Sequence, residues 1–434
     1  MTAGHAQEVE QGATERAARR VLMICYYFPP IHAVGANRSV GFASHLTGLG
    51  WIPTVLSVTK SRIPWERSGA PLPAGIEIVR SPEWNLHPFV EMADEASNRV
   101  FRAFGARRAP RILRSSFWIP DPQIAWRFFS AAVRLARQAD CIYVSCSPFS
   151  AAVTAAFVAK RTRKPLVLDF RDPWGGYGLP PRLQRWAISR ADRLILNTPR
   201  ALAAYARVYP HLAARMLAIP NGFDTLPDAS SAVPPTDTFT VMHVGEFYGS
   251  RQPDTLLEVL AELNLPDAEF VQVGSEPEAF ARFRTRVRIR HIQSVPRDEA
   301  ISLMQAASLL YLRIHHEERF AAMTVPAKTY EYLSTGVPIL AECQDGAASD
   351  LVRDYGINSD LVSPGNSADI KAAVLRAYHR RHEPSRRVNP RFAERFDRRV
   401  LTSQLAAAME AAVAGPSPGQ ADPPGRRAHP AEGA

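Results

Sequence analysis

The sequence is poor in cysteine and contains no long apolar segment. Its four cysteines form no C-x-x-C pair and have no histidine at metal-ligand spacing, so neither a disulfide framework nor a zinc site is predicted. No run of about 18 apolar residues occurs, which argues against a membrane-spanning helix. The first 20 residues are polar and lack the apolar stretch of a secretory signal. We therefore expect a cytoplasmic protein in a reducing compartment.

Acidic residues are scarce relative to basic ones. The chain has 52 lysines and arginines against 42 aspartates and glutamates, a net charge of +10, which favours anionic partners. The segment 96–120 contains six arginines and no carboxylate, with apolar side chains between them. It either lies on an anionic membrane or is a solvated insertion. No known nucleic-acid-binding module accompanies the basic residues, so a nucleic-acid partner is not expected.

Short apolar runs alternate with helical patterns along most of the chain, which predicts parallel sheets built from strand–helix–strand units. The strands expected in the first half are 21–25, 54–58, 76–79, 141–145, 166–170 and 194–197. Those expected in the second half are 240–244, 270–273, 287–289, 309–312, 338–341 and 360–362. The predicted fold class is α/β, with two doubly wound parallel-sheet domains of the Rossmann type.

A segment rich in Pro, Ser, Asp and Thr separates the two halves. The expected organisation is a disordered N-terminus (1–19), an N-terminal domain (20–222), a linker (223–238), a C-terminal domain (239–385), a C-terminal helix (386–413) and a disordered tail (414–434). The C-terminal helix carries an apolar stripe that needs a surface on one of the halves. Ligands of doubly wound sheets bind beyond the carboxyl ends of the strands, so we expect the site in the cleft between the halves.

A glycine-containing turn follows the first predicted strand. Gly35 and Arg38 lie between that strand and a helix, where backbone N–H groups and a helix N-terminus can bind an anion. Arg38 can add a charge-assisted contact to a phosphate. Because the G-x-G-x-x-G pattern is absent, a purely structural turn is the alternative.

The second half repeats this arrangement and adds a charged helix. Gly245 and Arg251 lie at its first strand-to-helix junction, where they suit the diphosphate of a nucleotide; an exposed arginine capping a turn is the alternative. Lys328 and Glu331 are three residues apart and share one face of a predicted helix. We expect Glu331 to accept both ribose hydroxyls and Lys328 to neutralise phosphate. A surface ion pair is the alternative.

Two charged residues follow a buried strand of the first half. Arg171 and Asp172 are expected to point into the cleft, although an internal pair between Arg171 and Asp169 would equally fix the loop. The residues at 315–318, His-His-Glu-Glu, resemble a metal site, but adjacent loop residues point apart and no metal site is predicted. Alternating arginines at 284–290 indicate a strand with a solvated basic edge.

Six segments, in this order, resemble glycosyltransferase family 4, the retaining enzymes of the GT-B fold. They are YYFPP…GANRSVGFASHL, FWIPDPQIAWRF, PLVLDFRDPW, AIPNGFD, HVGEFYGSRQPDTLLEVL and VPAKTYEYLSTGVPIL. The resemblance extends from about residue 21 to about residue 412. It implies transfer of a hexose from a nucleotide diphosphate sugar with retained anomeric configuration, no cofactor and no obligatory metal.

The resemblance also implies roles for individual residues. Gly35 and Arg38 match the family's N-terminal loop beside the donor diphosphate, and Arg251 matches the basic residue at the second domain's first strand-to-helix turn. Glu331 matches the second glutamate of the family's E-x7-E element, which binds ribose. The family's C-terminal helix crosses back to the first domain.

The sequence departs from the family pattern at two places. Met323 stands eight residues before Glu331, where the family has the glutamate that contacts the donor sugar. Glu317, Glu318 or backbone N–H groups near Met323 are the candidate replacements, and the donor sugar is left open. Arg171-Asp172 replaces a histidine often found in the first domain's cleft.

The expected catalytic groups are Arg251, Lys328, Asp172 and Arg171, acting on a nucleotide sugar donor. The expected acceptor is a glycan or a polyprenyl-linked glycan at the inner membrane face, in cell-surface polysaccharide biosynthesis, with the protein cytoplasmic or peripheral on the membrane. The alternatives are a soluble small-molecule acceptor, a sugar-nucleotide 2-epimerase on the same fold, and a catalytically inactive sugar-nucleotide-binding partner.

Overall fold

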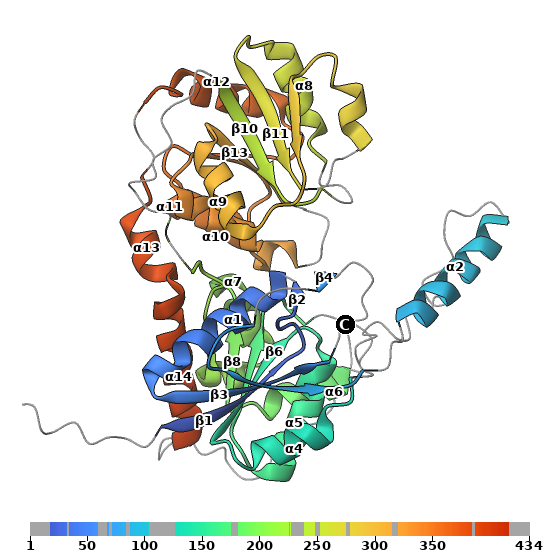
Figure 1. Cartoon of the computed structure of the whole chain (residues 1–434), viewed down its shortest axis with the longest axis vertical. Helices are drawn as coiled ribbons and strands as arrows, with labels where there is room; N and C mark the ends of the chain where they lie inside the picture. The colour runs from blue at the N-terminus through green and yellow to red at the C-terminus, as the bar shows by residue number, and fades with distance from the viewer. Residues whose placement is uncertain are drawn as a thin grey trace, which may run out of the picture.

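The computed structural model has two α/β domains stacked along the long axis of the molecule (Figure 1). The structure describes residues 18–32, 34–59, 67–68, 72–83, 87–103, 126–174, 181–224, 226, 238–247, 252–274, 278–314, 320–383 and 387–415.

Seven parallel strands form the sheet of the N-terminal domain, in the order β5-β3-β1-β6-β7-β8-β9. Along the chain they are β1 (Arg19–Cys25), β3 (Trp51–Val58), β5 (Glu77–Ser81), β6 (Cys141–Cys146), β7 (Leu166–Phe170), β8 (Arg193–Leu196) and β9 (Met216–Ala218). All residues of β6 and β7 are buried, because helices cover both faces of the sheet. The six strands predicted for this half are confirmed, and β9 was not predicted.

Helices flank this sheet. They are α1 (Val34–Leu46), α4 (Phe129–Ala136), α5 (Ser150–Thr162), α6 (Pro181–Ser189) and α7 (Pro199–Val208). A further helix, α2 (His87–Ala103), projects from the body of the domain (Figure 1). The short strands β2 (Ile31–His32) and β4 (Arg67–Ser68) pair antiparallel beside the main sheet.

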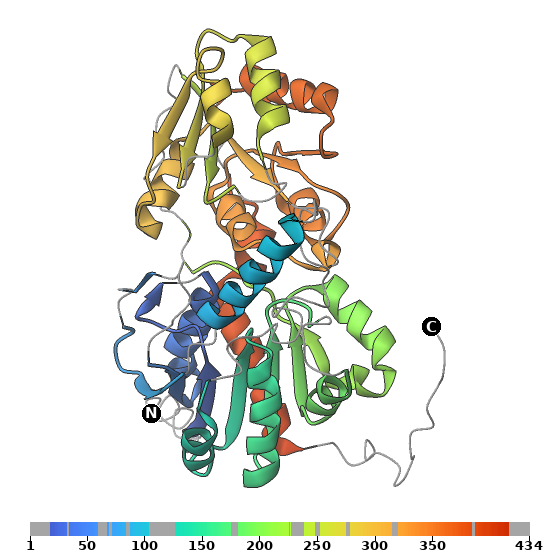
Figure 2. The same ribbon diagram turned by 90° about the vertical axis from the view of Figure 1, so that its right-hand side faces the viewer.

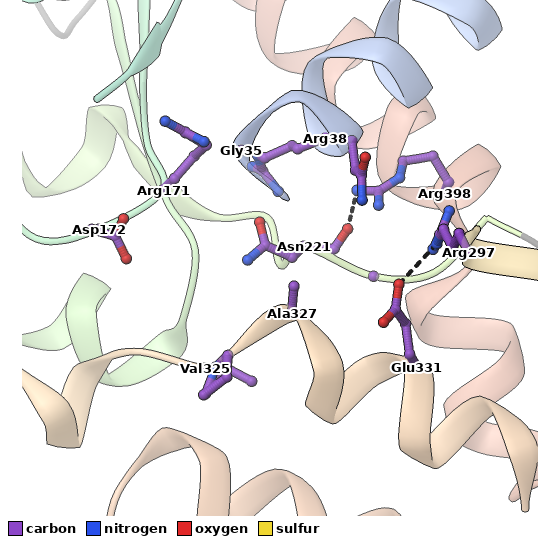
Figure 3. Close-up of a pocket in the computed structure, with 13 residues that line it drawn as sticks. Gly35, Arg38, Arg171, Asp172, Asn221, Arg297, Val325, Ala327, Glu331 and Arg398 are labelled. Carbon is purple, nitrogen blue, oxygen red and sulfur yellow. Dashed lines mark hydrogen bonds and ion pairs between the residues drawn. The ribbon is translucent and has the colours of Figure 1, made fainter. Parts of the chain in front are cut away.

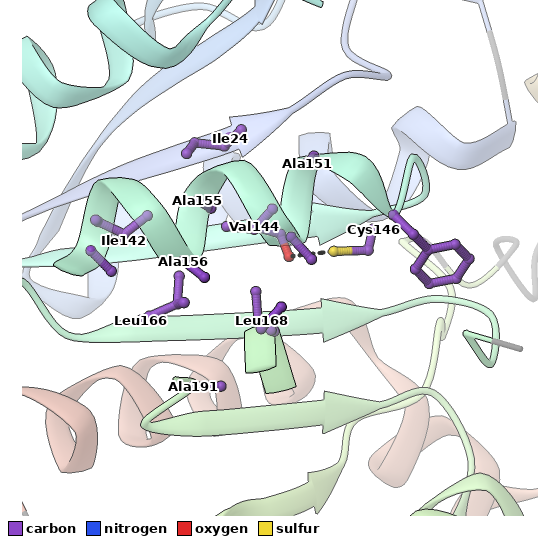
Figure 4. Close-up of a cluster of buried hydrophobic side chains, with 14 of the residues drawn as sticks. Ile24, Ile142, Val144, Cys146, Ala151, Ala155, Ala156, Leu166, Leu168 and Ala191 are labelled. Carbon is purple, nitrogen blue, oxygen red and sulfur yellow. Dashed lines mark hydrogen bonds between the residues drawn. The ribbon is translucent and has the colours of Figure 1, made fainter. Parts of the chain in front are cut away.

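Alanines let α5 lie close to the middle of this sheet. Its buried face presents Ala151, Ala155 and Ala156 to the aliphatic side chains of β6 and β7 (Figure 4). Small side chains on the helix and larger ones on the strands allow the two to pack closely. This packing fixes the strand ends that carry the candidate site.

Six parallel strands form the sheet of the C-terminal domain, in the order β12-β11-β10-β13-β14-β15. They are β10 (Phe239–Val244), β11 (Ala268–Val273), β12 (Ile289–Ile292), β13 (Leu309–Arg313), β14 (Ile339–Glu342) and β15 (Asp360–Val362). The helices are α8 (Asp254–Leu263), α9 (Arg297–Ala306), α10 (Ala327–Thr335), α11 (Ala347–Tyr355) and α12 (Ser367–His379).

The strand predicted at 287–289 is displaced towards the C-terminus. Val287 still belongs to a turn, because its N–H donates to the carbonyl of Phe283, and pairing with β11 begins two residues later. The strand β12 lies at the edge of its sheet and carries Arg290, which is exposed and pairs with Glu269. The two-domain α/β fold class is confirmed.

The chain ends in two helices, α13 (Pro390–Phe396) and α14 (Arg398–Ala414), which run from the upper domain to the lower one (Figures 1 and 2). Phe392 and Phe396 are buried in the core of the C-terminal domain. Leu401, Leu405 and Met409 are buried in the core of the N-terminal domain, against α1 and the sheet. The last helical segment therefore connects both cores, which gives the predicted stripe its surface.

Side-chain contacts also join the domains directly. Arg200 of α7 pairs with Asp345 and Asp350 of the C-terminal domain, with N–O distances of 2.7 and 2.5 Å. All four cysteines are buried and none forms a disulfide. Among the described residues, no helix combines the length and apolar character needed to span a bilayer.

Candidate functional site

A cavity of about 280 Å³ lies between the two domains (Figure 3). Its walls come from loops at the carboxyl ends of strands, from the N-termini of α1 and α10, and from the first residue of α14. The lining residues are Gly35, Asn37, Arg38, Arg171, Asp172, Asn221, Gly222, Arg297, Val325, Pro326, Ala327, Glu331 and Arg398. Four of these are arginines, so the cavity is suited to an anionic ligand.

Two helix N-termini open onto this cavity from opposite domains. Gly35 and Asn37 belong to the first turns of α1, and Ala327 begins α10 after Pro326. The first N–H groups of a helix have no partner inside the helix and carry the positive end of its dipole. An anion between the two domains would therefore face both helix ends.

Arg38 lines the cavity but is bound on the protein side. Its Nε and Nη2 donate to the two carboxylate oxygens of Asp169 at 2.7 and 2.9 Å, and it also donates to the carbonyls of Ile219 and Pro220. Tyr143 donates its hydroxyl to the same carboxylate. Asp169 is thus paired with Arg38, not with Arg171 as the sequence had allowed. This geometry favours a structural role for Arg38, and its contact with a donor phosphate stays a prediction.

Arg171 is held by neutral groups. Its Nε and Nη2 donate to the carbonyls of Cys146 and Ser147 at 3.3 and 2.9 Å, and its guanidinium lies 5.2 Å from the centre of the Tyr27 ring. No ion pair of Arg171 is found among the described residues. Its charge is therefore available to a ligand in the cavity.

Glycine at position 35 makes room for this guanidinium. A Cβ atom on Gly35 would overlap Nη1 of Arg171. We expect Gly35→Ala to push Arg171 off its two carbonyls and to lower kcat/KM for transfer by about 10- to 100-fold, since misplacing a binding group by about 1 Å has effects of this size.

The control for this substitution is Gly48→Ala. A Cβ atom on Gly48 meets no atom within 4 Å, so steady-state kinetics should be unchanged. Equal kinetics for Gly35→Ala and the wild type would show that the position of Arg171 does not matter for the reaction.

Glu331 belongs to a network of ion pairs that extends to Arg398, at the start of α14. Arg297 donates Nε to Oε1 of Glu331 at 2.8 Å and Nη1 to Asp224 at 2.6 Å. Asp224 also accepts from Nε of Arg398 at 2.8 Å. Burial alone would raise the pKa of Asp224, but the charges of Arg398 and Arg297 outweigh it and lower the pKa. The carboxylate of Glu331 is therefore oriented at the cavity wall by a network that stays ionised at neutral pH.

Lys328 and Gly245 lie together but do not line the cavity. Nζ of Lys328 is 2.9 Å from Nε2 of His243. A Cβ atom on Gly245 would lie 3.0 Å from the same Nζ atom. Lys328 and Glu331 were expected to act from one face of the helix, but they point in different directions. Glu331 faces the cavity beside Ala327, and Lys328 faces the end of β10. Arg251, expected beside Gly245, lies outside the described residues.

Met323 is an interdomain contact. Its side chain packs against the apolar core of the N-terminal domain, and its carbonyl accepts from Oγ1 of Thr198 at 2.7 Å. The N–H groups of Met323 and Thr324 donate to carbonyls within their own turn. Those two amides are therefore already bound, while Glu317 and Glu318, the other candidate replacements, lie outside the described residues.

Sequence reasoning missed four residues around the site: Arg297, Asp224, Arg398 and His243. Arg297 and Arg398 each stand at the first position of a helix, α9 and α14. Their contacts join residues up to 177 positions apart, for which a single sequence contains no signal. Within the described part of the chain, no three His, Cys, Asp or Glu side chains are grouped to hold a metal ion, and 315–318 lies outside that part.

The fold and the interdomain cavity define a protein of the GT-B class. Residues 78–225 match the family model of Glycosyltransferase Family 4, and residues 228–393 match that of Glycosyl transferases group 1. Together the two matches span most of both domains. The chain belongs to the glycosyltransferases of these two groupings, so the resemblance noted in the sequence is confirmed.

Several solved structures are similar to the chain over about nine-tenths of its length. HepE of Anabaena, in complex with UDP-glucose, is 16% identical with a TM-score of 0.59, covering 91% of this chain and 100% of HepE. A glycosyltransferase from Rickettsia africae is 12% identical (TM-score 0.58, 91% and 99% covered). The lipopolysaccharide outer core galactosyltransferase WaaB is 14% identical (TM-score 0.56, 90% and 99% covered). Comparison with the curated protein sequences gave no match.

Proposed function

We propose that this glycosyltransferase moves a hexose, with retention of configuration, from a nucleotide diphosphate sugar to a glycan or lipid-linked acceptor in cell-surface polysaccharide biosynthesis. The observation that carries the proposal is the interdomain cavity, which is lined by a fixed carboxylate, Glu331, by two helix N-termini and by Arg171. HepE, a relative in fold, was solved with UDP-glucose, which supports a nucleotide sugar as donor.

The donor is proposed to lie across the C-terminal wall. Glu331 accepts hydrogen bonds from the ribose hydroxyls, with its orientation fixed by Arg297. The diphosphate is proposed to lie near Lys328 and Gly245, with Arg251 as a further contact, and the helix N-terminus at Gly35 faces it from the other domain. No metal and no cofactor is required, because cationic side chains and helix dipoles supply the positive charge.

The acceptor hydroxyl is proposed to attack the sugar on the same face from which the diphosphate leaves. The bond between the anomeric carbon and the diphosphate oxygen breaks as the acceptor hydroxyl oxygen forms its bond to that carbon. The hydroxyl proton passes to the leaving phosphate oxygen, which gives the glycoside and a nucleoside diphosphate. Negative charge grows on the diphosphate, so Lys328, Arg251 and Arg171 stabilise the transition state more than the ground state. Asp172, at the cavity rim, is proposed to orient the acceptor hydroxyl.

An anionic membrane surface is proposed as partner, because acceptors linked to polyprenyl lipids lie there. Three neighbouring helices of the N-terminal domain, α4, α5 and α6, contain no carboxylate. Their exposed basic residues are Arg134, Lys160, Arg161, Arg182 and Arg185. Phe129 and Phe157 are 46% and 47% exposed on the same helices. Basic and aromatic side chains together suit an anionic bilayer interface. The segment 96–120, the earlier candidate for this contact, lies largely outside the described residues.

Charge reversal on α6 tests this surface. We expect Arg182→Glu with Arg185→Glu to lower partitioning onto phosphatidylglycerol vesicles by at least about tenfold, since each basic residue contributes about 1 kcal/mol near an anionic leaflet. Co-sedimentation measures the effect, with phosphatidylcholine vesicles as reference. The control is the double variant Arg284→Glu with Arg286→Glu, on the C-terminal domain. Equal partitioning of all three proteins would contradict a membrane role for α6.

A panel of nucleotide sugars, scored by thermal shift and then by product mass, tests the proposed reaction. The expected result is stabilisation by one class of donor and an acceptor that gains the mass of one hexose. Product formed without acceptor would favour an epimerase, and binding without turnover would favour an inactive sugar-nucleotide-binding protein. A soluble acceptor used as well as a lipid-linked one would favour small-molecule glycosylation.

A further inference from the structure

A buried histidine lies directly behind Lys328. His243, on β10, is 1% exposed, and its Nε2 is 2.9 Å from Nζ of Lys328. Its Nδ1 is 2.9 Å from Oε1 of Gln272, on the neighbouring strand β11. A carboxamide oxygen only accepts hydrogen bonds, so Nδ1 carries the proton and Nε2 accepts from the lysine ammonium.

The orientation of Gln272 is itself fixed. Its Nε2 donates to the carbonyl of Gly245 at 2.6 Å, which requires the amide nitrogen on that side and the oxygen towards His243. Gln272 is fully buried, so both ends of its amide need these partners. One line of hydrogen bonds therefore joins the Gly245 turn to Lys328 through Gln272 and His243.

The histidine is held neutral and in one plane. Burial lowers its pKa well below the usual value, and the charge of Lys328 lowers it further. The imidazole ring stacks on Phe247, with ring centres 3.8 Å apart. A neutral, immobile ring is a good acceptor for an ammonium group, whereas a protonated ring would repel it.

We propose that His243, supported by Gln272, is a positioning residue that holds the ammonium of Lys328 at the Gly245 turn, where the donor diphosphate binds. A flexible lysine loses rotamer entropy when it binds a phosphate, and a preset ammonium reduces that loss. The inference rests on the proposed function, since it assigns the diphosphate to Lys328.

Calorimetric binding to a nucleoside diphosphate and to its parent nucleoside tests the inference. The probe is whichever of UDP, GDP and ADP binds the wild type most tightly. We expect His243→Phe to weaken diphosphate binding by about tenfold or more, the effect of one hydrogen bond to a charged group, and to leave nucleoside binding unchanged. His243→Gln, which can still offer an acceptor to Lys328, should recover part of the loss.

A double-mutant cycle separates positioning from damage to the fold. In a Lys328→Ala background, His243→Phe should cause no further loss, because the histidine acts only through the lysine. The matched control is His291→Phe, since His291 is on the same sheet and its Nε2 lies 2.7 Å from the carbonyl oxygen of Gly274.

The outcomes distinguish the inference from the function on which it rests. A wild type that binds no nucleoside diphosphate would overturn the proposed function. If the wild type does bind a nucleoside diphosphate, either of two results would contradict the inference. Equal loss of nucleoside and diphosphate binding in His243→Phe, or a full additional loss in the Lys328→Ala background, would overturn the positioning role alone.

Discussion

Replacing Glu331 with alanine is expected to lower kcat/KM for the donor by about 10²- to 10⁴-fold while the protein stays folded. A carboxylate that accepts two ribose hydroxyls makes two charge-assisted hydrogen bonds, each contributing about 1.5–3 kcal/mol. The fold should tolerate the change, because Arg297 keeps its ion pair with Asp224 at 2.6 Å. Glu331 is also partly exposed, with 22% of its side chain accessible.

The chemistry of the ribose gives this prediction its sharpest test. A 2′,3′-dideoxy donor should be as poor a substrate for the wild type as the natural donor is for Glu331→Ala. The variant itself should not distinguish the two donors. Glu410→Ala, an exposed glutamate on α14, is the matched control and should behave as wild type. A Glu331→Ala enzyme that still prefers the natural donor would show that another group recognises the ribose.

The sheets of both domains could be predicted because most of their strands are short apolar runs, and those in the middle of each sheet are buried on both faces. The order of the strands follows the doubly wound pattern, and only β9 and the displaced β12 differ from expectation. These two are short edge strands with partly exposed residues, so their composition carries little of the burial signal. The strand ends that carry the site were predictable for the same reason as the strands.

The pairing of charges could not be predicted in the same way. Asp169 and Arg171 are two residues apart, but β7 ends at Phe170, so the alternation that would place them on one face stops between them. Arg38, 131 positions away, binds the carboxylate instead. Likewise Lys328 and Glu331 are near one another on α10, yet His243 and Arg297 draw them to different partners. Which partner a long charged side chain takes is decided by tertiary structure.

Disrupting the pair of Arg38 and Asp169 is expected to lower the free energy of unfolding by about 3–5 kcal/mol, the usual effect of breaking a buried ion pair. Both side chains are almost inaccessible, at 3% and 0% exposed. Burial alone would lower the pKa of Arg38, but the charge of Asp169 outweighs it and the pKa is raised. The guanidinium therefore stays charged, and Asp169→Asn would leave that charge buried without its counter-ion.

Thermal and urea unfolding of Asp169→Asn and Arg38→Met measure this effect, with Asp354→Asn, an exposed aspartate of α11, as a control expected within about 0.5 kcal/mol of wild type. The double variant Arg38→Met/Asp169→Leu should be more stable than either single variant, because it removes both charges together.

The same proteins decide between the two roles of Arg38. If its main task were to bind the donor diphosphate, Arg38→Met would keep its stability and lose affinity for nucleoside diphosphates. The buried, fourfold hydrogen-bonded guanidinium instead predicts a loss of stability, since it holds α1 and the Ile219–Pro220 turn against β7.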